Sequence, residues 1–178
     1  MKKIIYILPF LLLACSSKKS SEQPDVLLSE LTQGTVTCYG AYYKGLERNV
    51  VSLDLYSQDI TFDSLGYVHG TGTNLYISDI FIPLTDTVPA VGTYKCDTTT
   101  ALNTFLPGID FEGNPTGTYI LRIADSKISS IILCNDSSFV LSRIGEMTEI
   151  QFNLVADKKQ YKLHFRGVLK YEDKRQHL

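Results

Sequence analysis

The chain of 178 residues carries 17 Lys and Arg residues against 19 Asp and Glu residues, which gives a formal net charge of −2. This length suits one domain with a hydrophobic core of its own. No basic stripe with interleaved aromatic residues occurs, and this argues against nucleic acid as a partner.

Residues 1–14 have the features of an export signal. Two lysines follow Met1, an almost wholly apolar run extends from Ile4 to Leu13, and the small residue Ala14 comes next. The apolar run is too short to span a bilayer, which needs about 20 such residues. We therefore expect residues 1–14 to be removed as a signal peptide, with cleavage between Ala14 and Cys15.

The junction Leu12-Leu13-Ala14-Cys15 resembles the lipobox of bacterial lipoproteins. The resemblance implies that the Cys15 sulfur receives a diacylglycerol and that the new amino group is acylated. A single acyl chain holds a protein only marginally, whereas two or three make attachment stable. The expected partner is thus a membrane, reached through the lipid on Cys15. The alternative is an ordinary secretory signal in which Cys15 is incidental.

Residues 15–33 read as a lipidated N-terminus and polar tether. Ser, Lys, Glu and Gln dominate from Ser16 to Asp25, and none of these residues suits a core. The segment from Val26 to Leu31 is apolar enough for one or two helical turns or for a lead-in strand, and both alternatives stay open. We expect the folded domain to cover residues 34–173, followed by a charged tail at residues 174–178.

The domain is predicted to be all-β, because Tyr, Thr, Ile, Val and Phe are frequent and no long helical periodicity occurs. The clearest pattern is at the C-terminal end, where apolar and polar residues alternate over 148–156 and again over 160–171. If residues 157–160 form the loop between them, Phe152 pairs with Phe165 and Leu154 with Leu163.

Further strands are expected upstream, which makes nine or ten in all. The residue pair Asp125-Ser126 is predicted to be a turn, and residues 98–116 cannot be assigned. Sequential hairpins favour an antiparallel β-sandwich, with a calycin-like β-barrel as the alternative. The upstream strands are expected at residues 35–44, 50–56, 67–71, 74–83, 93–96, 117–124, 127–135 and 139–144.

Taken with the lipobox and the Ser-rich tether, several segments of the domain resemble small envelope lipoproteins of the Bacteroidetes. The resemblance is one of style rather than of a defined active site. It implies an outer-membrane location and a non-catalytic role. Lys18 and Lys19 depart from the acidic surface-export pattern of that group, so the surface and periplasmic faces both stay open. The segments are Pro89–Tyr94, Leu106–Gly108, Arg143–Gly145 and Phe165–Tyr171.

The same resemblance suggests O-glycosylation at three tripeptides that begin with Asp. Asp63-Ser64-Leu65, Asp86-Thr87-Val88 and Asp97-Thr98-Thr99 resemble the sites used in that phylum. The implied modified residues are Ser64, Thr87 and Thr98.

The sequence gives no sign of a metal site, a cofactor or a catalytic centre. The three histidines, His69, His164 and His177, do not have metal-ligand spacing, and no Gly-x-Ser-x-Gly elbow or phosphate-binding loop occurs. Once Cys15 carries lipid, three cysteines remain, and three cannot all pair within one chain. We interpret these three as small buried hydrophobic residues with at most one bridge: Cys38, Cys96 and Cys134.

Tyrosines offer the best candidates for binding. Tyr39 and Tyr43 share one face of a predicted strand, with Tyr42 on the other face, and Tyr76 follows further along. Exposed tyrosines on a rigid sheet stack on sugar rings through their apolar faces and bond through their hydroxyl groups. We therefore predict ligand stacking at Tyr39, Tyr43 and Tyr76. A coplanar set would favour glycan binding, and scattered half-buried rings would favour a structural role.

These observations predict a non-enzymatic, lipid-anchored envelope protein whose β domain binds a glycan or a surface-protein partner. One alternative is an assembly component of a surface complex, such as a pilus accessory. Another is a carbohydrate-active enzyme whose site the sequence does not reveal.

Overall fold

The computed structural model describes residues 26–27 and 30–175. The predicted signal peptide, its cleavage site between Ala14 and Cys15, the lipidated cysteine and most of the predicted tether lie outside the described residues.

Strands account for nearly all the regular structure, and no α-helix is assigned among the described residues. The all-β prediction is confirmed. Within the described residues, no helix has the length and apolar character needed to cross a membrane. The sixteen strands are β1 (Val26–Leu27), β2 (Leu31–Gly40), β3 (Asn49–Ser57), β4 (Ile60–Phe62), β5 (Val68–Gly70), β6 (Gly72–Ile82), β7 (Gly92–Cys96), β8 (Thr104–Phe105), β9 (Ile109–Phe111), β10 (Asn114–Thr116), β11 (Thr118–Ala124), β12 (Lys127–Leu133), β13 (Asn135–Ile144), β14 (Met147–Ala156), β15 (Lys159–Gly167) and β16 (Lys170–Asp173).

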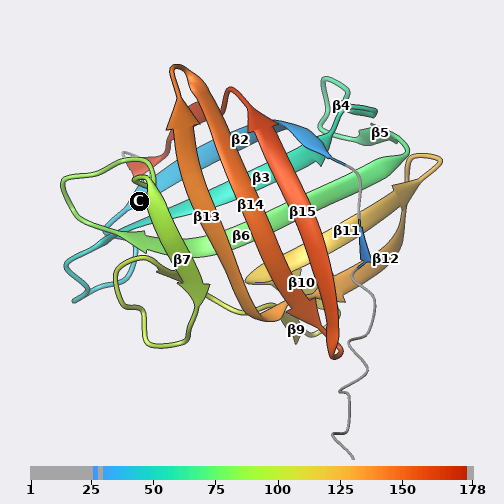
Figure 1. Ribbon diagram of the computed structural model, residues 1–178. Coiled ribbons are helices and arrows are strands. Elements are labelled where there is room, and N and C mark those ends of the chain that lie inside the picture. Colours follow the sequence, from blue (N-terminus) through green and yellow to red (C-terminus); the bar gives the residue numbers. More distant parts are fainter. Residues whose placement is uncertain (1–25, 28–29, 176–178) are drawn as a thin grey trace, which may run out of the picture.

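Twelve strands belong to one sheet, in the order β12-β11-β6-β3-β2-β15-β14-β13-β7-β8, with β1 beside β15 and β16 beside β2. The sheet curls strongly, so that β13, β14 and β15 cross over β2, β3 and β6 (Figure 1). The core lies between these two parts, because apolar residues from both form one buried cluster that includes Leu53, Ile77, Phe139 and Phe165. The short pairs β4–β5 and β9–β10 are separate two-stranded sheets.

The sheet is mixed rather than purely antiparallel, because the two ends of the described chain pair in parallel. β1 pairs with β15, Leu31 pairs with Phe165, and β2 pairs with β16 from Thr35 to Cys38. β1 already belongs to the sheet and Leu31 is fully buried, so the sheet begins at Val26, eight residues before the predicted domain start at residue 34. Val26, Leu27 and Leu31, described residues of the apolar segment, lie in strands.

The C-terminal hairpin has the predicted faces but a tighter turn. Phe152 pairs with Leu163 and Leu154 with Tyr161, two residues away from the predicted pairing. The loop contains only Asp157 and Lys158, whose φ angles of 49° and 64° are those of a type I′ turn. Because the shift is by two residues, every side chain keeps its face. The predicted four-residue loop was wrong.

The sequence was sufficient to predict one further hairpin turn but not the strands of residues 98–116. The predicted turn at Asp125-Ser126 is confirmed, with φ angles of 50° and 63° between β11 and β12. The unassigned segment 98–116 contains β8 and the exposed β9–β10 hairpin. That hairpin turns through Glu112 and Gly113, which also have positive φ angles.

Candidate functional site

The three tyrosines predicted to stack on a ligand lie around one hollow of about 290 Å³. It is formed by residues at and just after the end of β2, at the start of β3, and in β6. These three strands lie side by side in the order β2, β3, β6 (Figure 1). We call it the tyrosine hollow. Its lining residues are Tyr39, Tyr42, Tyr43, Val50, Tyr76, Ser78 and Asp79.

A glycine at the end of β2 brings two of these tyrosines into the hollow. Strand β2 ends at Gly40, four residues before the predicted end at Lys44. Gly40 has a φ of 71°, a left-handed conformation that glycine adopts without steric cost. The Tyr42 amide then donates to the Gly40 carbonyl at 2.8 Å. Tyr42 and Tyr43 therefore follow a turn, and the strand alternation that had placed them on opposite faces does not apply.

The tyrosine rings meet at steep angles. The Tyr39 and Tyr42 centroids are 6.3 Å apart with an interplanar angle of 65°, and those of Tyr42 and Tyr43 are 5.1 Å apart at 89°. Tyr42 is 52 % exposed, so its ring is open to a ligand. The rings are gathered but not coplanar, and Tyr39, Tyr43 and Tyr76 are half-buried, so the coplanar exposed platform expected from the sequence for glycan binding does not occur here. They are suited to enclosing a small group rather than to supporting a flat chain.

A bulge in β6 places a carboxylate in the hollow. The pairing of β3 with β6 shifts register between Val51 and Leu53, and Asp79 opposite this shift has a φ of 52°. Bulges of this kind redirect side chains beside binding sites. Asp79 accepts a hydrogen bond from the Ser78 hydroxyl at 3.1 Å and is also hydrogen-bonded to Tyr43.

The Tyr43 hydroxyl is held in its neutral form. Burial, and then the Asp79 carboxylate, raise the pKa of Tyr43 to about 12. At neutral pH Tyr43 is therefore a hydrogen-bond donor. A carboxylate offers about four lone-pair positions, so Asp79 keeps capacity for a ligand after accepting from Ser78 and Tyr43.

The base of the hollow is braced by neighbouring side chains. Tyr76 is hydrogen-bonded to Ser52 and Tyr39. Its ring stacks on that of Tyr119 in β11, with centroids 5.2 Å apart and an interplanar angle of 30°. Burial is the main cause that raises the pKa of Tyr76, so its hydroxyl is also neutral. Contacts on several sides fix this ring before any ligand arrives.

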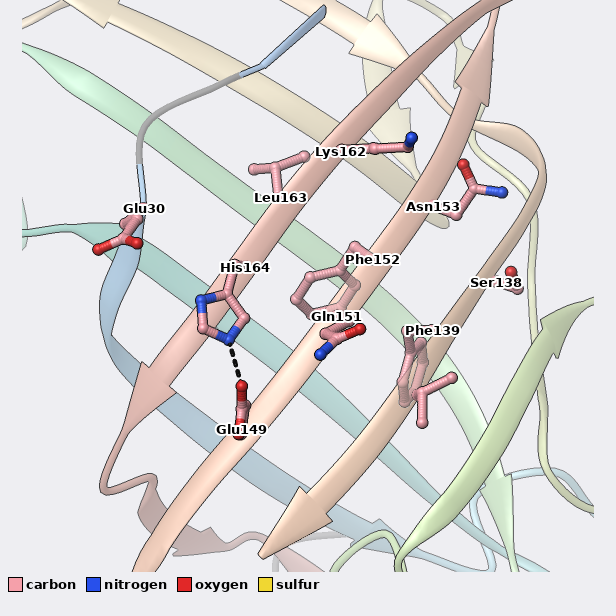
Figure 2. Close-up of a pocket in the computed structure, with 11 residues that line it drawn as sticks. Glu30, Ser138, Phe139, Glu149, Gln151, Phe152, Asn153, Lys162, Leu163 and His164 are labelled. Atoms are coloured by element: carbon pink, nitrogen blue, oxygen red, sulfur yellow. Dashed lines mark hydrogen bonds and ion pairs between the residues drawn. The ribbon is translucent and has the colours of Figure 1, made fainter. Parts of the chain in front are cut away.

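A larger groove of about 570 Å³ runs over the outer face of β13, β14 and β15 (Figure 2). His164 and Glu149 cross it as a hydrogen-bonded pair at 2.9 Å, next to Gln151. The aromatic residues that border the groove, Phe139 and Phe152, belong to the core and are at most 3 % exposed. The groove thus lies over the outer face of three strands, where polar side chains such as Gln151 and His164 stand beside the exposed Val140. We favour the smaller hollow, because it combines open aromatic rings with a carboxylate.

The three implied O-glycosylation residues all lie in turns or loops. Ser64 and Thr98 are exposed and Thr87 is partly exposed. The Asp63 side chain accepts from the amides of Leu65 and Tyr67, both at 2.9 Å, so the turn around Ser64 is well ordered.

The remaining titratable candidates are dispersed. Cys38, Cys96 and Cys134 are free thiols. Burial raises the pKa of Cys134 to about 12. His69 pairs with Asp63 at 3.2 Å on the β4–β5 hairpin. His177 lies outside the described residues. No group of three or more His, Cys, Asp or Glu side chains that could hold a metal occurs in the part of the chain that the structure describes.

Sequence reasoning missed Tyr42, Ser78 and Asp79 as members of the hollow. Two signals could have pointed to them. Gly40 marks the end of a strand within an aromatic run, and two adjacent polar residues interrupt the apolar stretch of β6. Both patterns are typical of a turn or a bulge.

Comparisons with known proteins gave no match, whether with family models, curated proteins or solved structures. What the hollow binds must therefore be argued from its own geometry and chemistry.

Proposed function

We propose that this protein is a lipid-anchored lipoprotein of the bacterial outer membrane or cell surface, and that its β domain binds a glycan in the tyrosine hollow. The observation that carries the binding proposal is the meeting of Tyr39, Tyr42, Tyr43 and Tyr76 around one hollow that also contains the Asp79 carboxylate.

The chemistry of the hollow matches that of a sugar. A sugar ring has apolar C–H faces that pack on aromatic rings, and its hydroxyl groups need donors and acceptors. Tyr42 presents an exposed ring, and Asp79 and the Tyr43 hydroxyl oxygen accept from sugar hydroxyl groups, since Tyr43 donates its own proton to Asp79. Ligand sites usually combine apolar walls with a few fixed polar groups, and the hollow has this composition.

We propose binding without catalysis. Glycoside hydrolysis usually requires two carboxyl groups on either side of the scissile bond. Asp79 is the one carboxylate among the described residues that line the hollow. The hollow therefore supports recognition better than it supports cleavage.

The proposed location rests on the lipobox Leu12-Leu13-Ala14-Cys15 and on the resemblance to Bacteroidetes envelope lipoproteins. Acylation of Cys15 would hold the domain at the membrane, and Ser64, Thr87 and Thr98 are proposed O-glycosylation sites. The exposure of Ser64 and Thr98 supports this role.

A glycan array probed with the full chain in detergent micelles tests the binding proposal. We expect binding to at least one class of glycan. The Tyr42→Ala variant should bind about two- to tenfold more weakly, since an aromatic contact contributes about 0.5–1.5 kcal/mol beyond its buried area. Tyr42 is already half exposed, so the fold should survive the change.

Tyr67→Ala is the matched control, because Tyr67 is 67 % exposed and belongs to the turn between β4 and β5. It should bind like the unmodified protein. Absence of binding across the array, or equal binding by the two tyrosine variants, would remove the glycan proposal.

A further inference from the structure

We infer that the tyrosine hollow selects a sugar that carries a protonated amine, a hexosamine with a free amino group, over the N-acetylated form of the same sugar. This inference rests on the proposed glycan-binding function and adds the charge class of the ligand.

The shape of the hollow comes first. Tyr42 stands at 89° to Tyr43 and at 65° to Tyr39, so the three rings form walls on different sides of a small space. A volume of about 290 Å³ lies just below the range for ligand pockets, which typically measure about 300–1,000 Å³. This space suits one sugar unit or its substituent rather than a run of several units.

The electrostatics of the walls favour a cation. The face of an aromatic ring is the negative end of its quadrupole, and aromatic cages recognise ammonium groups in this way. The Asp79 carboxylate adds a full negative charge, and no basic side chain is among the described lining residues. An acidic sugar would meet repulsion from Asp79, and an N-acetyl group would leave that charge uncompensated by the ligand.

One ring of the hollow already attracts an ammonium group within the protein. The Lys174 amino group lies 5.9 Å from the centroid of the Tyr39 ring. Lys174 follows β16 and does not line the hollow, and its position shows that the Tyr39 ring engages a cation of the protein at the C-terminal end of β2. The same interaction is open to a ligand amine on Tyr42, whose ring is more exposed to solvent.

The test uses two trisaccharides that differ only in acetylation. Tri-N-acetylchitotriose and its fully de-N-acetylated form share linkage and length, so a difference in affinity reports the amine. We expect the deacetylated trimer to bind the full chain in detergent about tenfold more tightly at pH 6 in calorimetry. The preference should shrink as NaCl is added, because salt screens partly exposed charges.

Asp79→Asn should abolish the preference. Asn tolerates the left-handed conformation of Asp79, so the bulge should be retained. The matched control is Asp110→Asn, which removes the same charge from an exposed position on β9 and should leave the preference unchanged.

The outcomes separate this inference from the function on which it rests. Equal binding of both trimers, tighter binding of the acetylated trimer, or an unchanged preference in Asp79→Asn would overturn the inference while leaving glycan binding intact. Binding of other glycans but of neither trimer would also overturn it. If no glycan binds at all, both proposals fail.

Discussion

Asp54 shows how a single residue on the outer face of the sheet connects stability with pH. It lies on β3 between the fully buried Leu53 and Leu55 and is itself only partly exposed. Its carboxylate accepts from the Tyr56 hydroxyl and from the Asn74 amide, the latter at 2.7 Å. Burial raises the pKa of Asp54, and these two hydrogen bonds offset only part of that rise.

The sign of the pH effect follows from the direction of this shift. A raised pKa means that folded Asp54 holds its proton more tightly than unfolded Asp54 does. Its contribution to the free energy of unfolding is therefore present in acid and is lost as pH rises through the folded pKa. We predict that the free energy of unfolding of Asp54→Asn declines less than that of the unmodified protein as pH rises above about 4, the ordinary pKa of this carboxyl group.

Urea unfolding at a series of pH values measures this effect. Asp110→Asn is the control, since Asp110 is exposed. If Asp54→Asn and Asp110→Asn change the pH profile equally, the Asp54 carboxylate does not have the proposed influence.

At the scale of single residues, side-chain chemistry was enough to predict the candidate tyrosines but not Asp79 beside them. Tyr39, Tyr43 and Tyr76 were predicted because of what tyrosine can bind, and the structure brings them together. Asp79 was missed because its orientation depends on a bulge, whose position is set by the pairing of β3 with β6. Tyr42 was missed because alternation was extended past the end of β2.

At the scale of elements, two hairpin turns make a matched pair. The β14–β15 turn places Lys158 at a φ of 64°, and the β11–β12 turn places Ser126 at a φ of 63°. This conformation is unfavourable for a residue with a Cβ atom by about 1–2 kcal/mol. Glycine adopts it freely but loses more entropy on folding.

We predict that Lys158→Gly raises the free energy of unfolding by about 0.5–1 kcal/mol, because it relieves the left-handed strain in a solvent-exposed turn. Ser126→Gly should gain less, because the Ser126 hydroxyl accepts a hydrogen bond from the Gly70 amide at 3.1 Å. Chemical denaturation of both variants measures the difference. A loss of stability in Lys158→Gly, or a larger gain in Ser126→Gly, would contradict this account.

The buried faces of β14 and β15 were predictable from the sequence, whereas the length of the loop between them was not. Period-two alternation in 148–156 and from Tyr161 to Phe165 placed the core-facing residues correctly. Its extension to Tyr171 was wrong, because β15 ends at Gly167 and Tyr171 lies exposed in the separate strand β16. Asp157-Lys158 lacks the glycine that usually marks a type I′ turn, so a longer loop was expected there. The segment 98–116 was unassigned because its strands have only two or three residues each.

For the whole molecule, the decisive feature is how the two ends of the described chain meet. Alternation shows which face of a strand is buried but not which strand lies beside it, so the parallel pairing of β2 with β15 and β16 could not be read from the sequence. Leu31 lies at the start of β2, where β15 pairs with it, and the tyrosine hollow lies at the other end of β2. Ten residues of strand separate them, a length of about 30 Å.

Anchoring is also a property of the whole molecule. We predict that Cys15→Ser moves the protein out of the membrane fraction or leaves it uncleaved, because two or three acyl chains are lost with the thiol. Cell fractionation measures the shift, and mass spectrometry of the mature protein reports both lipid on Cys15 and sugars on Ser64, Thr87 and Thr98. An N-terminus without lipid, or a variant that stays membrane-bound, would contradict the anchoring proposal.

The pairing of β2 with β16 has a consequence for the order in which the molecule is completed. One edge of β2 pairs with β3, the next strand in the chain, but its other edge acquires neighbours only when β15 and β16 have been synthesised. An emerging polypeptide therefore carries β2 with one edge unpaired until β15 and β16 have also emerged, and such long-range contacts form slowly. The sheet is thus completed late in synthesis, when β15 and β16 pair with the remaining edge of β2.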